Sequence, residues 1–258
     1  MKRVLFLIPH PDDEIVAAAT TIARERAKGV EICGLFMTCG VPPADKMWPW
    51  ERKRRDAKVR QRRDEAEAAA KLLGMEITGF APWPSRALKA NLAEALAMIR
   101  RAVAEKNIDT LWVAAWEGGH QDHDVANFLA AQFRSDMPVF EFAEYNLSNG
   151  QPNWQRFSVP NGTETILTLT PEETRAKLAL LATYRSEKGN LAAVKVACES
   201  YRPLPAYDYT RPPHDGKLSR EWFHWVGKIF PHPRVDFEPS ENVYSALKAF
   251  KTAPPNRA

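Results

Sequence analysis

Two short motifs offer the groups that a metal-dependent hydrolase needs. The first, HPDDE, occupies residues 10 to 14, and the second, EGGHQDH, occupies residues 117 to 123. Together they supply imidazole nitrogens and carboxylate oxygens. A catalytic zinc ion takes three such protein ligands and keeps a fourth position for water. The motifs therefore predict a zinc site that activates water.

Each motif directly follows a short apolar run, VLFLI for the first and LWVAAW for the second. Such runs are typical of buried strands, and the carboxyl ends of parallel strands share the sheet edge where ligands bind. We assign His10, Asp13 and His123 as the zinc ligands. Successive residues at a helix start point in different directions, so we expect the adjacent Asp12 to face the water as its general base.

Each motif taken alone has a structural explanation. Acidic residues are common in the first turn of a helix, where they complement the helix dipole. A single histidine in a loop is more often a surface group. The presence of both motifs at one predicted sheet edge is what favours a catalytic site.

The elements that position the motifs alternate between apolar runs and helical spacing. We predict strands at residues 4–8, 30–37, 76–80 and 111–116. Helices are predicted at residues 13–28, 90–105 and 122–133, and a long helical stretch is predicted to end at residue 75. Such alternation implies an α/β fold, with a Rossmann-like, mostly parallel sheet and helices on both faces.

The order loosens after residue 137. Strands are predicted at 138–147 and 165–169, with a turn between them, and a helix at 171–184 with Thr170 as its N-cap. From about residue 200 the chain is rich in proline and aromatic residues. We therefore divide it into a catalytic core, residues 1–195, and an irregular C-terminal extension packed on it, residues 196–258.

Composition excludes several classes of protein. The net charge of +4 over 258 residues is too small to imply nucleic-acid binding without a concentrated patch. The three cysteines form no CxxC pair, so neither a disulfide framework nor a thiolate zinc site is expected, and a reducing cytoplasm fits. No uncharged stretch approaches the roughly 18 apolar residues of a membrane helix.

The motifs HPDDE and HQDH resemble the signature of the PIG-L/LmbE-like family of zinc N-deacetylases. The resemblance implies the same three zinc ligands and Asp12 as the base. It adds His120 as a catalytic imidazole, which would stabilise the oxyanion and help to protonate the leaving amine. Asp122 would orient His120.

Two further segments extend the resemblance over roughly residues 1 to 190. The stretch RRDE at residues 62 to 65 looks like the family's Arg-x-x-Glu helix, which implies that Arg62 faces the substrate. The segment KLALLATYRSE resembles a late helix that usually ends in Ser-Gln. Here Glu187 stands in place of the glutamine.

We therefore expect a zinc-dependent hydrolase that removes an N-acyl group, most simply acetyl, from an amino sugar or its conjugate. An amidase acting on a longer acyl or peptide-like amide fits the same motifs. Trp48, in a proline-containing loop after the second strand, offers a ring on which a sugar could stack, although packing explains it equally well.

A nucleotide- or nucleic-acid-binding module is the alternative from another class. The basic stretch from Lys46 to Arg63 would serve it, but a solvated helix face is the simpler interpretation. The first strand is followed by HPDDE and not by a glycine-rich loop, and carboxylates at that point would repel a pyrophosphate.

Overall fold

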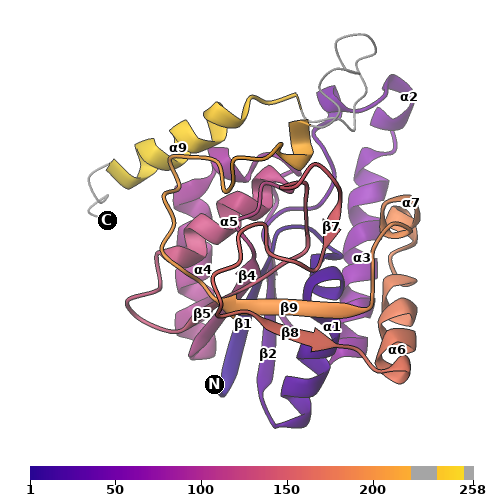
Figure 1. The fold of residues 1–258 in the computed structure, drawn as a ribbon. Coiled ribbons are helices and arrows are strands. Elements are labelled where there is room, and N and C mark those ends of the chain that lie inside the picture. The colour runs from indigo at the N-terminus through magenta and orange to yellow at the C-terminus, as the bar shows by residue number, and fades with distance from the viewer. Residues whose placement is uncertain (222–236, 253–258) are drawn as a thin grey trace.

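The computed structural model describes residues 1–221 and 237–252. A seven-stranded sheet with the order β3-β2-β1-β4-β5-β9-β8 forms its centre (Figure 1). The first five strands in this order are parallel, and β9 and β8 join through antiparallel pairings. The strands are β1 (Arg3–Ile8), β2 (Glu31–Phe36), β3 (Glu76–Phe80), β4 (Thr110–Ala114), β5 (Val139–Phe142), β8 (Thr165–Thr168) and β9 (Cys198–Pro203).

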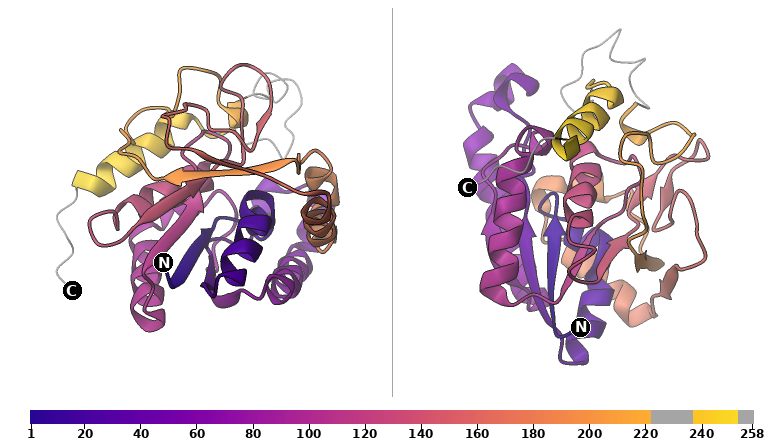
Figure 2. Two further views of the ribbon diagram at one scale, coloured as in Figure 1. Left: turned by 60° about the horizontal axis from the view of Figure 1, so that its bottom comes forward. Right: turned by 90° about the vertical axis from the view of Figure 1, so that its left-hand side faces the viewer.

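Helices cover both faces of the sheet (Figure 2). Side chains of β1 alternate between two hydrophobic clusters, with Leu5 and Leu7 in one and Val4 and Phe6 in the other, because successive residues of a strand face opposite ways. This confirms the predicted α/β class. On one face pack α1 (Asp13–Ala27), α3 (Arg55–Leu73) and α6 (Pro171–Leu181), and on the other α4 (Leu92–Lys106), α5 (Gln121–Ala131) and α9 (Ser240–Thr252).

Short elements connect the main ones. They are η1 (Ala44–Lys46), α2 (Pro49–Arg52), η2 (Leu88–Ala90), η3 (Arg185–Glu187), α7 (Lys188–Leu191) and η4 (Ser219–Glu221), with a two-stranded sheet of β6 (Tyr145–Asn146) and β7 (Asn153–Trp154). None of the described helices is both long enough and apolar enough to cross a membrane.

The second half of the chain departs from the expectations in two places. The single strand expected at 138–147 is divided into β5 and β6, and the expected turn ends in β7, which pairs with β6. The segment beyond residue 195 is less irregular than predicted, because β9 lies inside the central sheet and α9 is a regular helix. Residues 222–236 and 253–258 of the expected extension lie outside the described residues.

The sequence does not predict β9, because the polar residues of this strand look exposed but are buried in ion pairs. Glu199 lies 2.8 Å from Lys177 of α6, and Arg202 lies 2.7 Å from Glu141 of β5. Because β9 lies between β5 and β8, the boundary proposed at residue 195 leaves one strand of the central sheet in the extension. The division into core and extension remains a prediction for the chain beyond β9.

The same Lys177–Glu199 pair supports a break in α1. Ala18 has non-helical angles, φ −145° and ψ 16°, which release backbone groups on both sides of it. Lys177 donates to the carbonyl oxygen of Val16 at 2.8 Å, and Glu199 accepts the N–H of Thr21 at 2.7 Å. A buried ion pair therefore replaces the missing helical hydrogen bonds in the helix that carries the first motif.

Candidate active site

The two motifs meet at the point where the strand order reverses. β1 and β4 are neighbours, with Leu7 opposite Val113, and β2 continues the sheet on the other side of β1. In open parallel sheets, ligands bind in the crevice at the carboxyl ends of strands at such a reversal. The connection from β1 carries residues 10 to 14 into this crevice, and that from β4 carries residues 117 to 123.

Three atoms at this point form a nearly equilateral triangle. His10 Nδ1 lies 3.2 Å from His123 Nε2, and Asp13 Oδ2 lies 3.2 Å from the former and 3.1 Å from the latter. Ligands bound tetrahedrally to zinc at about 2.0–2.2 Å lie roughly 3.3–3.5 Å from one another. The residues that were predicted as ligands are therefore brought together in an arrangement that fits zinc.

The electrostatics of the triangle favour a cation. Burial lowers the pKa of His10, but Asp13 and Asp122 outweigh this effect and raise it to about 10. Burial raises the pKa of Asp13, yet the neighbouring His123 and His10 outweigh it, and the net shift is downward. Positive charge is thus stabilised beside the two carboxylates, as a bound divalent metal requires.

Asp122 supports the first ligand. Its Oδ2 lies 3.0 Å from His10 Nε2, and the same oxygen accepts the backbone N–H of Arg86 at 2.5 Å. Metal-binding histidines commonly donate their second ring N–H to a carboxylate, which fixes tautomer and orientation. The carboxylate of Asp122 makes no hydrogen bond to His120, since its Oδ2 lies 3.8 Å from His120 Nδ1, and the predicted orientation of His120 by Asp122 stays a prediction. Asp122 faces the chain before η2, and this direction pairs it with His10.

His120 is the N-cap of α5. Its Nδ1 accepts the backbone N–H of Asp122 at 3.1 Å, so the proton of the neutral ring is on Nε2. Burial, and next the neighbouring His10, lower the pKa of His120 well below its usual value. The ring therefore offers a neutral N–H donor beside the metal ligands. It also lies close enough to His10 and His123 to complete an alternative ligand set.

Asp12 occupies a strained backbone conformation. Its φ of 127° and ψ of −25° are rare for a residue other than glycine, and such outliers cost about 1–3 kcal/mol and cluster at functional sites. Its N–H donates to Glu14 Oε2 at 3.1 Å, and the Tyr184 hydroxyl donates to the other oxygen of Glu14. Burial raises the pKa of Asp12 well above its usual range, although Arg62 opposes the shift.

A cavity of about 410 Å³ opens in front of the triangle. Tyr145 and Trp154, from β6 and β7, line it. Trp48 is not among the described residues that do so; it stacks on Trp50 with 4.9 Å between ring centroids. The expected stacking of sugar on Trp48 stays a prediction, and Tyr145 and Trp154 are the aromatic residues that the cavity presents.

Sequence reasoning missed Glu144 and Tyr145, although a signal was available. Both residues follow β5, which is the neighbour of β4 in the sheet, so they stand at the same edge as the two motifs. Glu144 lines the cavity and is buried. Burial, and next Asp13, raise its pKa well above the usual value.

Comparison with known protein families gives a match over residues 5–133, which is half of the chain, to PIG-L, described as GlcNAc-PI de-N-acetylase. The chain belongs to the PIG-L family. The matched segment runs from β1 into the residues after α5 and contains both motifs. Comparison with curated proteins gave no match.

Solved structures share the PIG-L fold of this chain. A deacetylase from the teicoplanin biosynthesis pathway, crystallised as a bog complex, has 18% identity and a TM-score of 0.63, covering 80% of this chain and 99% of its own. The N,N'-diacetylchitobiose deacetylase of Pyrococcus horikoshii has 20% identity and a TM-score of 0.55, with 79% and 84% covered. The 4-carboxy-2-hydroxymuconate hydratase of Pseudomonas putida has 19% identity and a TM-score of 0.50, with 80% and 98% covered.

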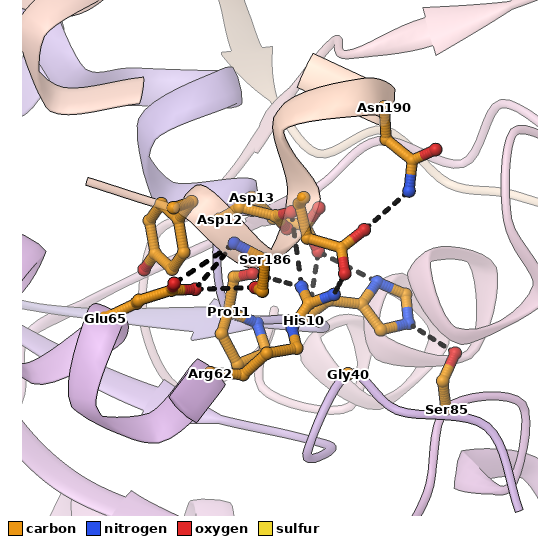
Figure 3. Close-up of polar contacts among 12 residues, drawn as sticks. His10, Pro11, Asp12, Asp13, Gly40, Arg62, Glu65, Ser85, Ser186 and Asn190 are labelled. Carbon is orange, nitrogen blue, oxygen red and sulfur yellow. Dashed lines mark hydrogen bonds and ion pairs between the residues drawn. The ribbon is translucent and has the colours of Figure 1, made fainter. Parts of the chain in front are cut away.

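Arg62, in the helix that resembles the PIG-L Arg-x-x-Glu segment, points inward. Its guanidinium donates to the carbonyl oxygen of Pro11 and lies 3.2 Å from Asp12 Oδ2 and 2.5 Å from Glu187 Oε1 (Figure 3). A Cβ on Gly40, which has φ +68°, would lie 2.7 Å from Arg62 Nε. Arg62 contacts the strained turn and also lines the cavity. Its contact with substrate stays a prediction.

A second contact ties the same helix to the cavity wall. Glu65, one turn after Arg62, accepts the hydroxyl of Ser186 at 2.6 Å and its N–H at 3.1 Å (Figure 3). Glu187 pairs with Arg62 and, at 3.3 Å, with Lys58. Two residues of α3, Glu65 and Arg62, therefore hold the η3 segment against the site.

We expect Arg62→Ala to lower kcat/KM by at least about tenfold while zinc stays bound, because a charge-assisted contact that positions Asp12 is removed. Steady-state kinetics and elemental analysis measure both effects. Arg60→Ala, an exposed change on the same helix, is the matched control and should leave kinetics unchanged. Parent-like kinetics of Arg62→Ala would show that the contact has no part in catalysis.

Proposed function

We propose that this protein is a zinc-dependent hydrolase that removes an N-acyl group, most simply acetyl, from an amino sugar or its conjugate. The triangle of His10, Asp13 and His123 with Asp12 beside it is the observation that carries the proposal. Membership of the PIG-L family supports the reaction type. Two structural relatives are a deacetylase of the teicoplanin biosynthesis pathway and an N,N'-diacetylchitobiose deacetylase.

The protein residues would divide the work of amide hydrolysis. His10, Asp13 and His123 would hold a zinc ion, which would supply a Lewis acid for activating water and polarising the amide carbonyl. Asp12, which lines the cavity beside the three ligands, would accept the proton of the attacking water. His120 presents Nε2–H as a donor to the developing oxyanion. The proton taken by Asp12 is then available to the departing amine.

The cavity suits a small carbohydrate ligand. Its volume of about 410 Å³ is within the range of pockets that enclose small molecules. Tyr145 and Trp154 offer ring faces to the apolar side of a sugar, and Lys46 at the rim offers a cation to an acidic substituent. We propose a free amino sugar or a small conjugate as substrate, acted on in the cytoplasm, where the unpaired cysteines are stable.

A longer acyl group is the second candidate for the bond that is cleaved. Val16, Leu191 and Val194 give the cavity an apolar wall, which could take an acyl chain longer than acetyl. A nucleotide-binding role has less support, since the carboxylates of Asp12, Asp13 and Asp122 gather where a pyrophosphate would have to lie.

The decisive experiment is acetate release from a panel of N-acetyl amino sugars and conjugates, run beside N-butyryl and N-octanoyl analogues. Zinc-loaded protein should release acetate, a chelator should abolish the reaction, and added zinc should restore it. A preference for the octanoyl analogue would favour the longer-acyl candidate. Absence of product from every substrate with zinc bound would contradict the proposed hydrolysis.

A further inference from the structure

A buried carboxylate and the outer ring nitrogen of a predicted metal ligand face each other without hydrogen-bond partners. Neither carboxylate oxygen of Glu144 has a partner among the described residues, nor has Nδ1 of His123. Glu144 is 1% exposed and His123 is 2% exposed. The separation of Glu144 Oε2 and His123 Nδ1 is 3.8 Å, so a small rotation of either side chain would bring them within hydrogen-bond distance.

The role of His123 at the triangle requires a proton on Nδ1. A neutral imidazole that presents Nε2 to a metal carries its hydrogen on Nδ1, and a buried N–H without an acceptor is destabilising. The other imidazole ligand shows the complete arrangement, since His10 presents Nδ1 to the triangle and pairs its Nε2 with Asp122 at 3.0 Å. His123 has a carboxylate in the equivalent position, at a longer distance.

The backbone of Glu144 is fixed in a way that aims its side chain at this place. Its N–H donates to Glu117 Oε1 at 2.8 Å, and its carbonyl oxygen accepts the N–H of Gln155 at 2.9 Å. Glu117 also accepts the N–H of Tyr145 at 2.9 Å. The loop after β4 thus holds the residues after β5, and Glu144 has only its side-chain torsions left to adjust.

We propose that Glu144 accepts the Nδ1–H of His123, and so fixes the tautomer and ring orientation with which His123 binds the metal. Each imidazole ligand then has its own carboxylate, Asp122 for His10 and Glu144 for His123. Glu144 is a positioning residue, because it acts on the metal only through His123. The inference rests on the proposed zinc site, but its test needs no substrate.

Zinc affinity of the full-length protein, measured by competition with a chromophoric chelator, tests this role. Glu144→Leu removes the acceptor and should weaken binding by about 10- to 100-fold, the usual effect of losing such a partner. Glu144→Gln keeps an acceptor oxygen and should stay close to the parent. Glu51→Leu removes a carboxylate from the cavity wall on α2 and is the matched control, with affinity unchanged.

Two further readouts separate positioning from simple stability. Zinc should raise the melting temperature of Glu144→Leu less than that of the parent, because a weaker ligand stabilises less at the same concentration. The cobalt-substituted protein should show an altered visible spectrum in Glu144→Leu and a parent-like one in Glu144→Gln. If Glu144→Leu does not fold, Glu144→Asp, whose acceptor is withdrawn by one methylene, should show the same changes to a smaller extent.

Parent-like zinc affinity and cobalt spectrum in Glu144→Leu, or in Glu144→Asp if only that variant folds, would overturn the proposal. A parent that binds two zinc ions, one of which is lost with Glu144, would also overturn it, by making Glu144 a direct ligand. Failure to release acetate from any substrate would instead contradict the proposed function. The zinc affinities of the Glu144 variants would still test the positioning role.

Discussion

Asp12→Asn should retain zinc and the native fold and lose at least about a hundredfold in kcat, the scale expected when a positioned proton acceptor is removed. The asparagine fits the same space and can keep the N–H bond to Glu14, but it cannot take a proton from water. Asp12 is also outside the ligand triangle and next to Arg62, at 3.2 Å, so zinc affinity should change little. Single-turnover kinetics with bound zinc quantified in the same sample give both values.

Asp13→Asn is the matched variant, because the two residues are neighbours with identical side chains and different partners. Asp13 Oδ2 lies within 3.2 Å of both imidazole ligands, so loss of its charge should release zinc. Added zinc should then restore part of the activity of Asp13→Asn and none of the activity of Asp12→Asn. If Asp12→Asn loses its metal while Asp13→Asn keeps metal and activity, the two roles are exchanged.

Lys177→Met should lower the free energy of unfolding by about 3–5 kcal/mol, because it leaves the carboxylate of Glu199 buried without its counter-charge. Both side chains are 0% exposed, and their atoms are 2.8 Å apart. Lys177 also donates to the carbonyl oxygen of Val16 at the break in α1, so that acceptor loses a partner as well. For a chain of this length the melting temperature should fall by roughly 10 °C, measurable by calorimetry.

Two companion variants make this stability prediction specific. Lys28→Met removes an exposed lysine that pairs with Glu25 at 2.6 Å, and exposed pairs contribute only about 0–1 kcal/mol, so the melting temperature should hardly move. Lys177→Met combined with Glu199→Gln removes the unpaired charge and should recover part of the loss. Equal stability of Lys177→Met and the parent would show that water or a rearrangement satisfies Glu199.

The central fold could be predicted because local signals agreed with the tertiary arrangement. Alternating apolar runs and helical segments predicted the first four parallel strands, and strand ends placed both motifs at one edge. The capping box of Thr170 with Glu173 confirms the predicted start of α6. Prediction failed at β9, since Glu199 and Arg202 look like surface residues until their partners on α6 and β5 are known.

Within the site, the sequence by itself determined which residues could bind zinc. His10 and Asp13 are three residues apart at one strand end, and Asp13 Oδ2 accepts the N–H of His10 at 2.7 Å, so their association is local. The second motif carries its chemistry in the same way, in the first turn of α5. Residue type and spacing within one turn of chain were enough to propose these ligands.

Only the tertiary structure decided which carboxylate serves which imidazole. Asp122 is two residues from His120, yet it pairs with His10, which is 112 residues away in the chain. Glu144 faces His123, and Arg62 turns inward to Pro11, across similarly long separations. The reason is physical: a buried polar group pairs with whichever partner the packing of other segments brings within about 3 Å, and sequence distance does not report that packing.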